Sequence, residues 1–193
     1  MIAFLRGRFV HKSPAQLWID VNGVGYEVHI SLNTYTKIQD AEEGILYTSQ
    51  LIREDAHLLF GFHDLAEKDL FQQLISVSGI GASTARVMLS YLKPEELAAA
   101  IVRGDTKTLE AIKGIGKKTA ERMVLELKDK LSKSAAELNN FSLKNNTLQQ
   151  DALNALTALG IARQAAAQAV EKTLKANPEM GVEDLIKTAL RSL

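Results

Sequence analysis

The sequence predicts an α+β protein of several small domains, in which a β-barrel precedes a series of helices. Apolar residues alternate with period two through residues 1–63, which is typical of strands. From Asp64 onward they recur at the three- and four-residue spacing of amphipathic helices. Within the helical part, VSGIGASTARVML at 77–89 nearly repeats as IKGIGKKTAERMV at 112–124. The 193 residues are enough for two or three such domains.

The strands expected in residues 1–63 are separated by clear turn signals. In LWIDVNGVGYEVHIS, Leu17, Ile19 and Val21 alternate with polar or aromatic neighbours before the hairpin signal Asn22-Gly23. A second apolar pair, GILYTSQLI and AHLLFGF, is joined by REDA, and IAFLRGRFVH precedes them all. Five strands in so short a segment are typical of a small closed barrel, here an OB-like barrel.

Residues 64–133 are expected to form a helical domain. Asp64 is suited to cap the first helix, and Glu67 three residues later completes a capping box. Four further helices are predicted, punctuated by Pro94 and Gly104, at residues 82–92, 94–103, 105–112 and 117–131.

The C-terminal part of the chain predicts a linker and a third domain. Residues 134–147 are polar, rich in Asn and Ser and aperiodic, so a flexible linker is expected there. Residues 148–193 predict three short amphipathic helices. Three apolar side chains near the Gly160 turn are candidates for contact with a partner, with core packing as the alternative for each: Leu156, Leu159 and Ile161.

Composition argues against several functions. The chain has no cysteine, which removes disulfides, thiolate metal sites and cysteine nucleophiles. No Ser-His-Asp arrangement is visible, so we expect no catalytic site and no cofactor. No run approaches 18 apolar residues, and the charged start MIAFLRGRF does not resemble a signal peptide, so a soluble cytoplasmic protein is expected. Four scattered histidines without i,i+4 pairing predict no metal site: His11, His29, His57 and His63.

Charge is segregated along the chain although the net charge is zero. Residues 103–133 hold nine Lys and Arg against five Asp and Glu, whereas residues 1–63 hold five against seven. The basic segment contains the second glycine repeat, which favours an anionic partner at that repeat.

Each Gly-Ile-Gly follows one helix and begins another, so it predicts a tight helix-to-helix hairpin. Glycines permit positive φ and leave no Cβ above the turn, so another backbone can approach closely. The new helix offers unpaired amides and the positive end of its dipole to an anion, while the isoleucine turns toward the core. The candidate phosphate-binding residues are Gly79, Ile80, Gly81, Ala82, Ser83 and Thr84 in the first copy and Gly114, Ile115, Gly116, Lys117, Lys118 and Thr119 in the second.

Two other interpretations of the repeat fit the sequence less well. A Gly-x-Gly that only ends a helix, with solvated lysines, explains one copy but not two in register. The stretch AIKGIGKKT is close to a P-loop, but Ala111 stands at the first glycine position and Lys118 at the Ser/Thr position. The element also follows a helix and not a strand, so ATP binding is not expected. Two hairpins that grip two phosphates would bind nucleic acid without reading its sequence.

The two copies resemble tandem helix-hairpin-helix motifs, which bind duplex nucleic acid. Their order after a barrel with LIREDAHLLFGF, together with GIGKKTAER and ELKDK, resembles the RuvA family over essentially the whole chain. That resemblance implies sequence-independent binding of four-way (Holliday) DNA junctions during recombination, DNA repair and the SOS response to DNA damage. It also implies that the third domain is UBA-like.

The resemblance further implies the assembly in which the protein works. It implies a non-catalytic subunit that forms a homotetramer, one subunit per junction arm, or an octamer of two tetramers around the DNA. The implied partners are RuvB, the ATP-driven motor of branch migration, and the RuvC resolvase. The third domain would then be the part that contacts RuvB.

Glu54 and Asp55 lie between two expected strands, which places them at a hairpin tip. A solvated turn is the simple interpretation, and a metal site is disfavoured because no third carboxylate accompanies the pair. The RuvA resemblance implies instead that the pair forms an acidic pin at the centre of the junction, where it repels phosphates.

Two alternatives of other kinds remain open at this point. A base-excision glycosylase also uses a motif like GIGKKTA, but it needs a catalytic Asp or Lys in a larger helical domain, where this chain enters a polar segment. Trp18 and Tyr26 lie on expected strands, and an aromatic face of such a barrel is able to stack single-stranded bases, but core packing or subunit contact is the favoured interpretation for both.

Overall fold

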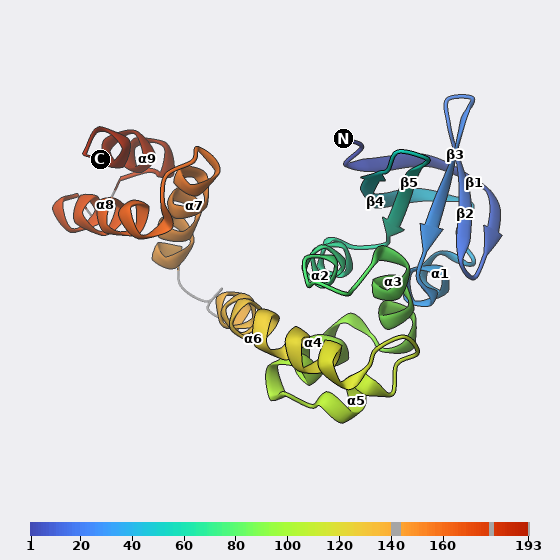
Figure 1. Ribbon diagram of the computed structural model, residues 1–193. Helices are drawn as coiled ribbons and strands as arrows, with labels where there is room; N and C mark the ends of the chain where they lie inside the picture. The colour runs from blue at the N-terminus through green and yellow to red at the C-terminus, as the bar shows by residue number, and fades with distance from the viewer. Residues whose placement is uncertain (140–143, 178–179, 193) are drawn as a thin grey trace. The chain divides into compact units, whose positions relative to one another are not determined.

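The computed structural model describes residues 1–139, 144–177 and 180–192 (Figure 1). The chain divides into two compact units, Met1–Ser132 and Lys133–Leu193. The first unit contains a β-barrel and the helices that follow it, and the second contains helices alone. The predicted α+β architecture is therefore confirmed.

Five strands form a closed barrel in the order β1-β2-β3-β5-β4. The β3–β5 pair is parallel and the other pairs are antiparallel. The turn between β2 and β3 has positive φ at Asn22 (51°) and Gly23 (89°), as a tight two-residue hairpin requires. The strands are β1 (Phe4–Ser13), β2 (Gln16–Val21), β3 (Val24–Ile30), β4 (Glu43–Ile52) and β5 (His57–Phe62).

The alternation in the sequence correctly identifies the inner face of the barrel. Leu17 and Ile19 of β2 are fully buried, and they pair in register with Val28 and Tyr26 of β3. The same core takes in Leu5, Phe9, Ile30, Ile38 and Leu46.

One helix of the barrel was not predicted. α1 (Leu32–Ile38) connects β3 to β4 and begins at Ser31, whose hydroxyl accepts a hydrogen bond from the Thr34 amide at 3.0 Å. It has only seven residues and contains two β-branched threonines, so the sequence carries little helical signal. Figure 1 shows α1 beside α3, the helix that follows the first glycine hairpin.

The helical part of the first unit shares one core with the end of the barrel. Phe71 of α2 lies with its ring 5.1 Å from that of Phe60 and 4.9 Å from that of Phe62, both in β5. The buried core continues from these rings through the helices, so the barrel and the helices form one unit. The helices are α2 (Leu65–Ile75), α3 (Ala82–Tyr91), α4 (Pro94–Arg103), α5 (Thr106–Glu110) and α6 (Lys117–Asn139).

The predicted capping box of α2 is only half formed. Asp64 accepts a hydrogen bond from the Glu67 amide at 2.8 Å, as expected of an N-cap. The Glu67 carboxylate does not return to the Asp64 amide; it accepts hydrogen bonds from Ser31 and Thr34 instead. Two hydroxyls distant in sequence therefore take the place of the Asp64 amide as hydrogen-bond partners of Glu67.

The predicted linker is helical wherever the structure describes it. α6 continues to Asn139 and α7 begins at Lys144, so the expected boundaries at 133 and 148 do not mark helix ends. Residues 140–143, the remaining part of the expected linker, lie outside the described residues.

The second unit contains the three expected helices, α7 (Lys144–Ala158), α8 (Arg163–Ala176) and α9 (Val182–Arg191). Small and apolar side chains form its core, among them Ala152, Leu156 and Leu185. Gly160, with φ at 90°, makes the turn between α7 and α8. Within the described residues, no helix has both the length and the apolar character that crossing a membrane requires.

Candidate nucleic-acid interface

The two Gly-Ile-Gly turns have the same backbone structure. Gly79 and Gly114 adopt φ of 95° and 94°, a conformation that other residues rarely take. After each, the isoleucine amide donates to a carbonyl three residues back: Ile80 to Val77 and Ile115 to Ile112, both at 3.0 Å. The repeat in the sequence is therefore a repeat in structure.

The second glycine of each turn has a different role from the first. Gly81 has φ −84° and ψ 165°, which any residue can adopt, and Gly116 also lies outside the positive-φ region. A Cβ built on Gly81 or Gly116 would meet no described atom within 4 Å. Neither position needs glycine for the fold, so the missing side chain leaves a surface that another backbone can approach.

The helices after the turns begin with unpaired amides. Gly81 accepts from Ala85 at 2.9 Å and Gly116 from Ala120 at 3.0 Å, which fixes the first turn of α3 and of α6. Among the described residues, the three amides that open each helix, 82–84 and 117–119, have no acceptor. An anion at either helix start would therefore find several donors and the positive end of the helix dipole.

The side chains of the candidate residues fall into three groups. Ile80 and Ile115 are buried as predicted, and Ala82 is buried too, so these three can offer an anion only their backbone. Ser83, Lys117 and Lys118 are exposed beside the open glycines, and Thr84 and Thr119 are half-buried.

The half-buried threonines connect the two motifs. A Cβ on Gly79 would lie 4.0 Å from Thr119 Oγ1, and a Cβ on Gly114 would lie 3.9 Å from Thr84 Cγ2. Each threonine thus lies against the first glycine of the other hairpin. The reciprocal contact places the two hairpins side by side in one unit.

Arg122 also belongs to this surface, although it was not among the residues predicted from the sequence. It is exposed on α6, and its guanidinium donates to the Ser78 carbonyl at 3.3 Å, just before the first hairpin. Arg122 lies four residues after Lys118, so the two share one face of α6. That spacing was the signal in the sequence that could have identified it.

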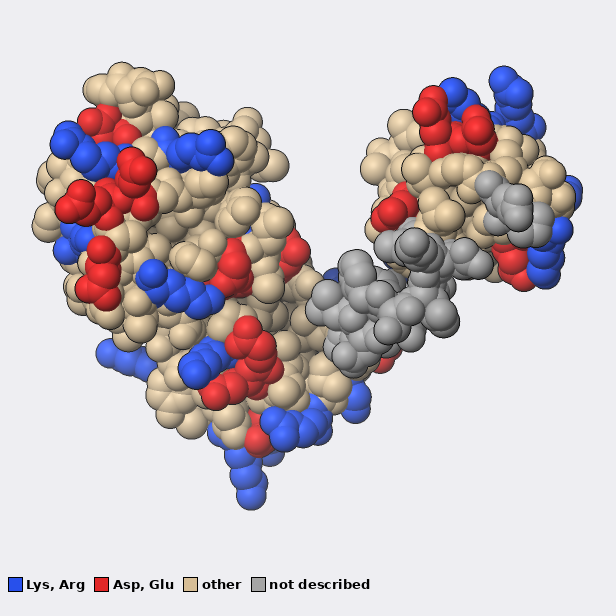
Figure 2. Space-filling model, turned by 180° about the vertical axis from the view of Figure 1, so that it is seen from behind, with Lys and Arg blue, Asp and Glu red and all other residues tan. Residues whose placement is uncertain are grey.

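Positive charge gathers at this end of the first unit. Figure 2 shows Lys and Arg side chains that project from its lower end, which is the end formed by α5 in Figure 1. Lys113, Lys117 and Lys118 are exposed in this part of the chain. Elsewhere on the same face the two signs are mixed, so the basic end is a local feature.

The acidic pair lies at the predicted hairpin tip. Residues 53–56 join β4 to β5, and the Arg53 amide donates to the Ala56 carbonyl at 2.8 Å. Glu54 and Asp55 are exposed, and neither carboxylate has a hydrogen bond or an ion pair with a described residue. No group of three His, Asp or Glu suited to a metal ion occurs within the described part of the chain.

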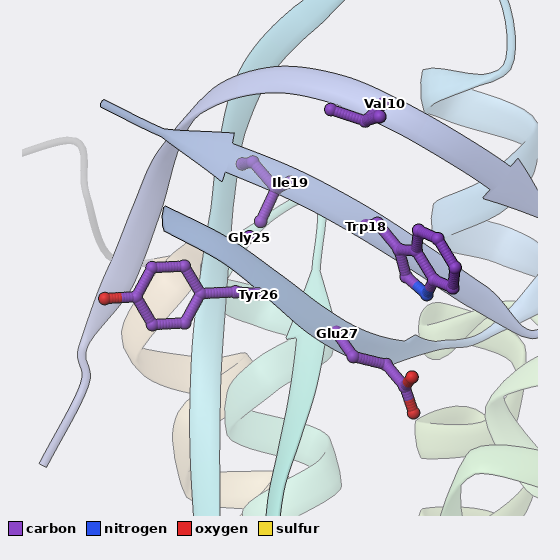
Figure 3. A pocket seen from close by; sticks show the side chains of 6 residues that line it. All are labelled: Val10, Trp18, Ile19, Gly25, Tyr26 and Glu27. Carbon is purple, nitrogen blue, oxygen red and sulfur yellow. The ribbon is translucent and has the colours of Figure 1, made fainter. Parts of the chain in front are cut away.

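The barrel aromatics do not form a platform for bases. Ile19 pairs with Tyr26 and Trp18 pairs with Glu27, so Trp18 and Tyr26 point to opposite faces of the sheet (Figure 3). Tyr26 packs against the barrel core, and the Trp18 ring lies 5.0 Å from the His11 ring and is half-exposed. A surface hollow of about 300 Å³ is lined by Val10, Trp18, Ile19, Gly25, Tyr26 and Glu27.

A closed five-stranded barrel followed by two paired glycine hairpins with open helix starts defines a protein of the tandem helix-hairpin-helix class. Family profiles agree with this division of the chain. The profile of the RuvA N-terminal domain matches residues 1–61, that of a SAM-like helix-hairpin-helix tandem matches 71–129, and that of the RuvA C-terminal domain matches 147–193.

Three full-length proteins of similar sequence are named Holliday junction branch migration complex subunit RuvA. Those of Christiangramia forsetii and Flavobacterium psychrophilum are each 46% identical, over 100% of both chains. That of Cytophaga hutchinsonii is 45% identical over 99% of both chains. The chain belongs to the RuvA family. The glycosylase alternative gains no support from these matches.

Proposed function

We propose that this protein is the non-catalytic subunit that binds four-way DNA junctions without reading their sequence. The observation that carries the proposal is the pair of open glycines, Gly81 and Gly116, each at a helix start with unpaired amides. The names of the full-length relatives support a four-way junction as the particular DNA structure.

Each hairpin would bind one phosphate of a DNA backbone. The amides at the start of α3 and α6 donate to the phosphate oxygens, and the absent side chains of Gly81 and Gly116 let the sugar-phosphate chain reach them. Lys117 and Lys118 add charge at the second hairpin. Such contacts position the protein on DNA but carry no sequence information, which suits a protein that must follow a moving junction.

The exposed carboxylates of Glu54 and Asp55 would act by repulsion. Two unit charges about 10 Å apart in water repel by roughly 0.4 kcal/mol. Several copies of the pair around a junction centre would add up to a bias against re-pairing of the strands there. The loop would thus weaken affinity slightly while keeping the junction open.

The assembly proposed for this chain is a homotetramer, or two tetramers that enclose the DNA. A four-way junction offers four equivalent arms, and a tetramer gives each arm one pair of hairpins. The half-exposed Trp18, 46% accessible beside the barrel hollow, is suited to a subunit contact. Light scattering on the purified protein measures the mass of the assembly, and therefore the number of subunits, directly.

The second unit would recruit the RuvB motor, whose ATPase drives branch migration, while RuvC resolves the junction. Leu159 is 63% exposed beside the Gly160 turn and Ile161 is half-buried, so both remain candidate contacts with the motor. Leu156 is fully buried in the core of this unit, which favours the alternative of core packing for this residue.

Binding to a four-way junction and to a linear duplex with the same arm sequences tests the central proposal. We expect tighter binding to the junction, and the same affinity when the arm sequences are scrambled. Equal affinity for junction and duplex would overturn the proposal of junction binding.

Truncation after Asn139, which keeps α6 whole, should leave junction binding intact and abolish branch migration by added RuvB. A truncated protein that still activates the motor would remove the role of the second unit.

A further inference from the structure

Glu67 is the only charged side chain that is fully buried among the described residues. It lies in the first turn of α2, and its carboxylate accepts hydrogen bonds from two hydroxyls of the unpredicted helix α1 and its cap. Ser31 donates to Oε1, and Thr34 donates to Oε2 at 2.8 Å. Phosphate binding, the acidic loop and the motor contact make no use of this group.

Both hydroxyls are held in place by the backbone. Ser31 Oγ accepts from the Thr34 amide at 3.0 Å, and Thr34 Oγ1 accepts from the His63 amide at 3.0 Å, just after β5. Glu67 therefore joins α2, α1 and the end of β5. Burial raises the pKa of Glu67, and the two hydroxyl bonds oppose that rise. In some proteins a buried ionic group contributes more to a unique arrangement than to stability.

α1 also contacts the helix of the first hairpin. The Leu32 amide donates to Ser90 Oγ at 3.0 Å, and Asn33 Nδ2 donates to the Leu92 carbonyl at 3.0 Å and to that of Leu89. These partners lie at the far end of α3, the helix that starts at the open glycine. A continuous chain of contacts thus runs from the hairpin through α3 and α1 to the barrel.

We propose that Glu67 is a positioning residue for junction selectivity. By holding Ser31 and Thr34, it fixes the barrel, and with it the acidic loop, relative to the paired hairpins. The inference rests on the proposed function, because only a junction engages both parts at once. A linear duplex needs the hairpins alone, whereas a junction also needs Glu54 and Asp55 at its centre.

Glu67→Gln tests the hydrogen-bonded contact of Glu67 with Ser31 and Thr34, called the joint below, with little change of side-chain volume. The amide nitrogen of Gln cannot accept, so one buried hydroxyl loses its acceptor and the joint loosens. Asp69→Asn is the matched control, since it makes the same carboxylate-to-amide change at an exposed position of the same helix. We expect Glu67→Gln to lower the ratio of junction to duplex affinity on the order of threefold to tenfold, and the control to leave it unchanged.

A double-mutant cycle separates positioning from simple loss of stability. In a protein that already carries Glu54→Gln and Asp55→Asn, Glu67→Gln should cause no further loss of selectivity, because the loop no longer has a charge to place. If its effect multiplies with that of the loop variant, or if Glu67→Gln alone keeps full selectivity, the inference is wrong. A wild-type protein without junction preference would instead overturn the proposed function, on which the inference depends.

Thr34 provides a second route if Glu67→Gln folds poorly. Thr34→Val removes, with almost no change of shape, the hydroxyl that donates to Glu67 and accepts from the His63 amide, and Thr34→Ser keeps that hydroxyl. We expect the valine variant to lose selectivity as Glu67→Gln does and the serine variant to retain it. The opposite order, or equal selectivity in both, would contradict a role for the Glu67 hydrogen bonds.

Discussion

Gly79 and Gly81 stand two residues apart in one hairpin, yet only Gly79 has a backbone that requires glycine. Its φ is 95°, whereas that of Gly81 is −84° with open space where a Cβ would lie. Gly114 and Gly116 repeat the same division in the second hairpin. The first glycine of each pair thus makes the turn, and the second leaves room for a partner.

The same substitution should therefore change the stability of the fold at the first position and hardly at all at the second. Gly79→Ser forces a side chain into the left-handed region and should lower the free energy of unfolding by about 1–2 kcal/mol. Gly81→Ser puts a good N-cap residue on α3 and should change it by less than about 0.5 kcal/mol. Urea unfolding followed by circular dichroism measures both. Equal losses at the two positions would mean that Gly81 also serves the fold.

Lys117 and Lys118 should contribute to DNA affinity through salt-dependent contacts. Replacement of both by Ala should weaken junction binding and reduce the slope of log affinity against log salt by up to about 0.9 per lost contact in each subunit. Lys128→Ala with Lys130→Ala is the matched control, because these exposed lysines lie about 16 Å further along the same helix. A slope that stays at the wild-type value in the first variant would make Lys117 and Lys118 ordinary surface charge.

Neutralising the acidic loop should separate affinity from selectivity. Glu54→Gln with Asp55→Asn removes two negative charges per subunit and keeps the turn, because neither carboxylate bonds to a described residue. We expect DNA binding at least as tight as in the wild type, with weaker discrimination between junction and duplex. Competition binding with both DNAs measures the ratio. Weaker binding with full discrimination would point to a structural role for the loop.

The stability of the joint should depend on pH through Glu67. Burial raises its pKa above the ordinary 4.5, so the ionised form is less favourable in the folded than in the unfolded protein. The contribution of Glu67 to the unfolding free energy is therefore greatest below about pH 4.5 and falls as pH rises through the folded-state pKa. Glu67→Gln does not titrate at this position. The wild type minus variant difference, from urea unfolding, should decline as pH rises above about 4.5 and level off once the folded-state pKa is passed; a rising difference would contradict this sign.

Local patterns predicted the strands and the glycine hairpins well. Alternation fixes the buried face of β2, and Asn22-Gly23 specifies a turn with two positive φ angles. The Gly-Ile-Gly repeat likewise encodes a backbone that needs only its own few residues. These features depend on residues that are close together in the sequence, so local sequence patterns are enough to predict them.

The features that were missed depend on distant partners. Glu67 looked like a local capping residue, but its carboxylate bonds to Ser31 and Thr34, 36 and 33 residues away. α1 gains its contacts from α3, and Thr84 and Thr119 lie against the other motif. No periodicity within one segment records such tertiary pairing.

The central claim is that DNA backbone enters the space above Gly81 and Gly116. The most direct measurement is the affinity of the Gly81→Val, Gly116→Val double variant for a four-way junction. Valine suits the extended backbone of Gly81, and at both positions its Cβ meets nothing described within 4 Å. The account predicts a folded protein, with melting close to wild type, that has lost junction and duplex binding together. Wild-type affinity in the folded double variant would contradict it.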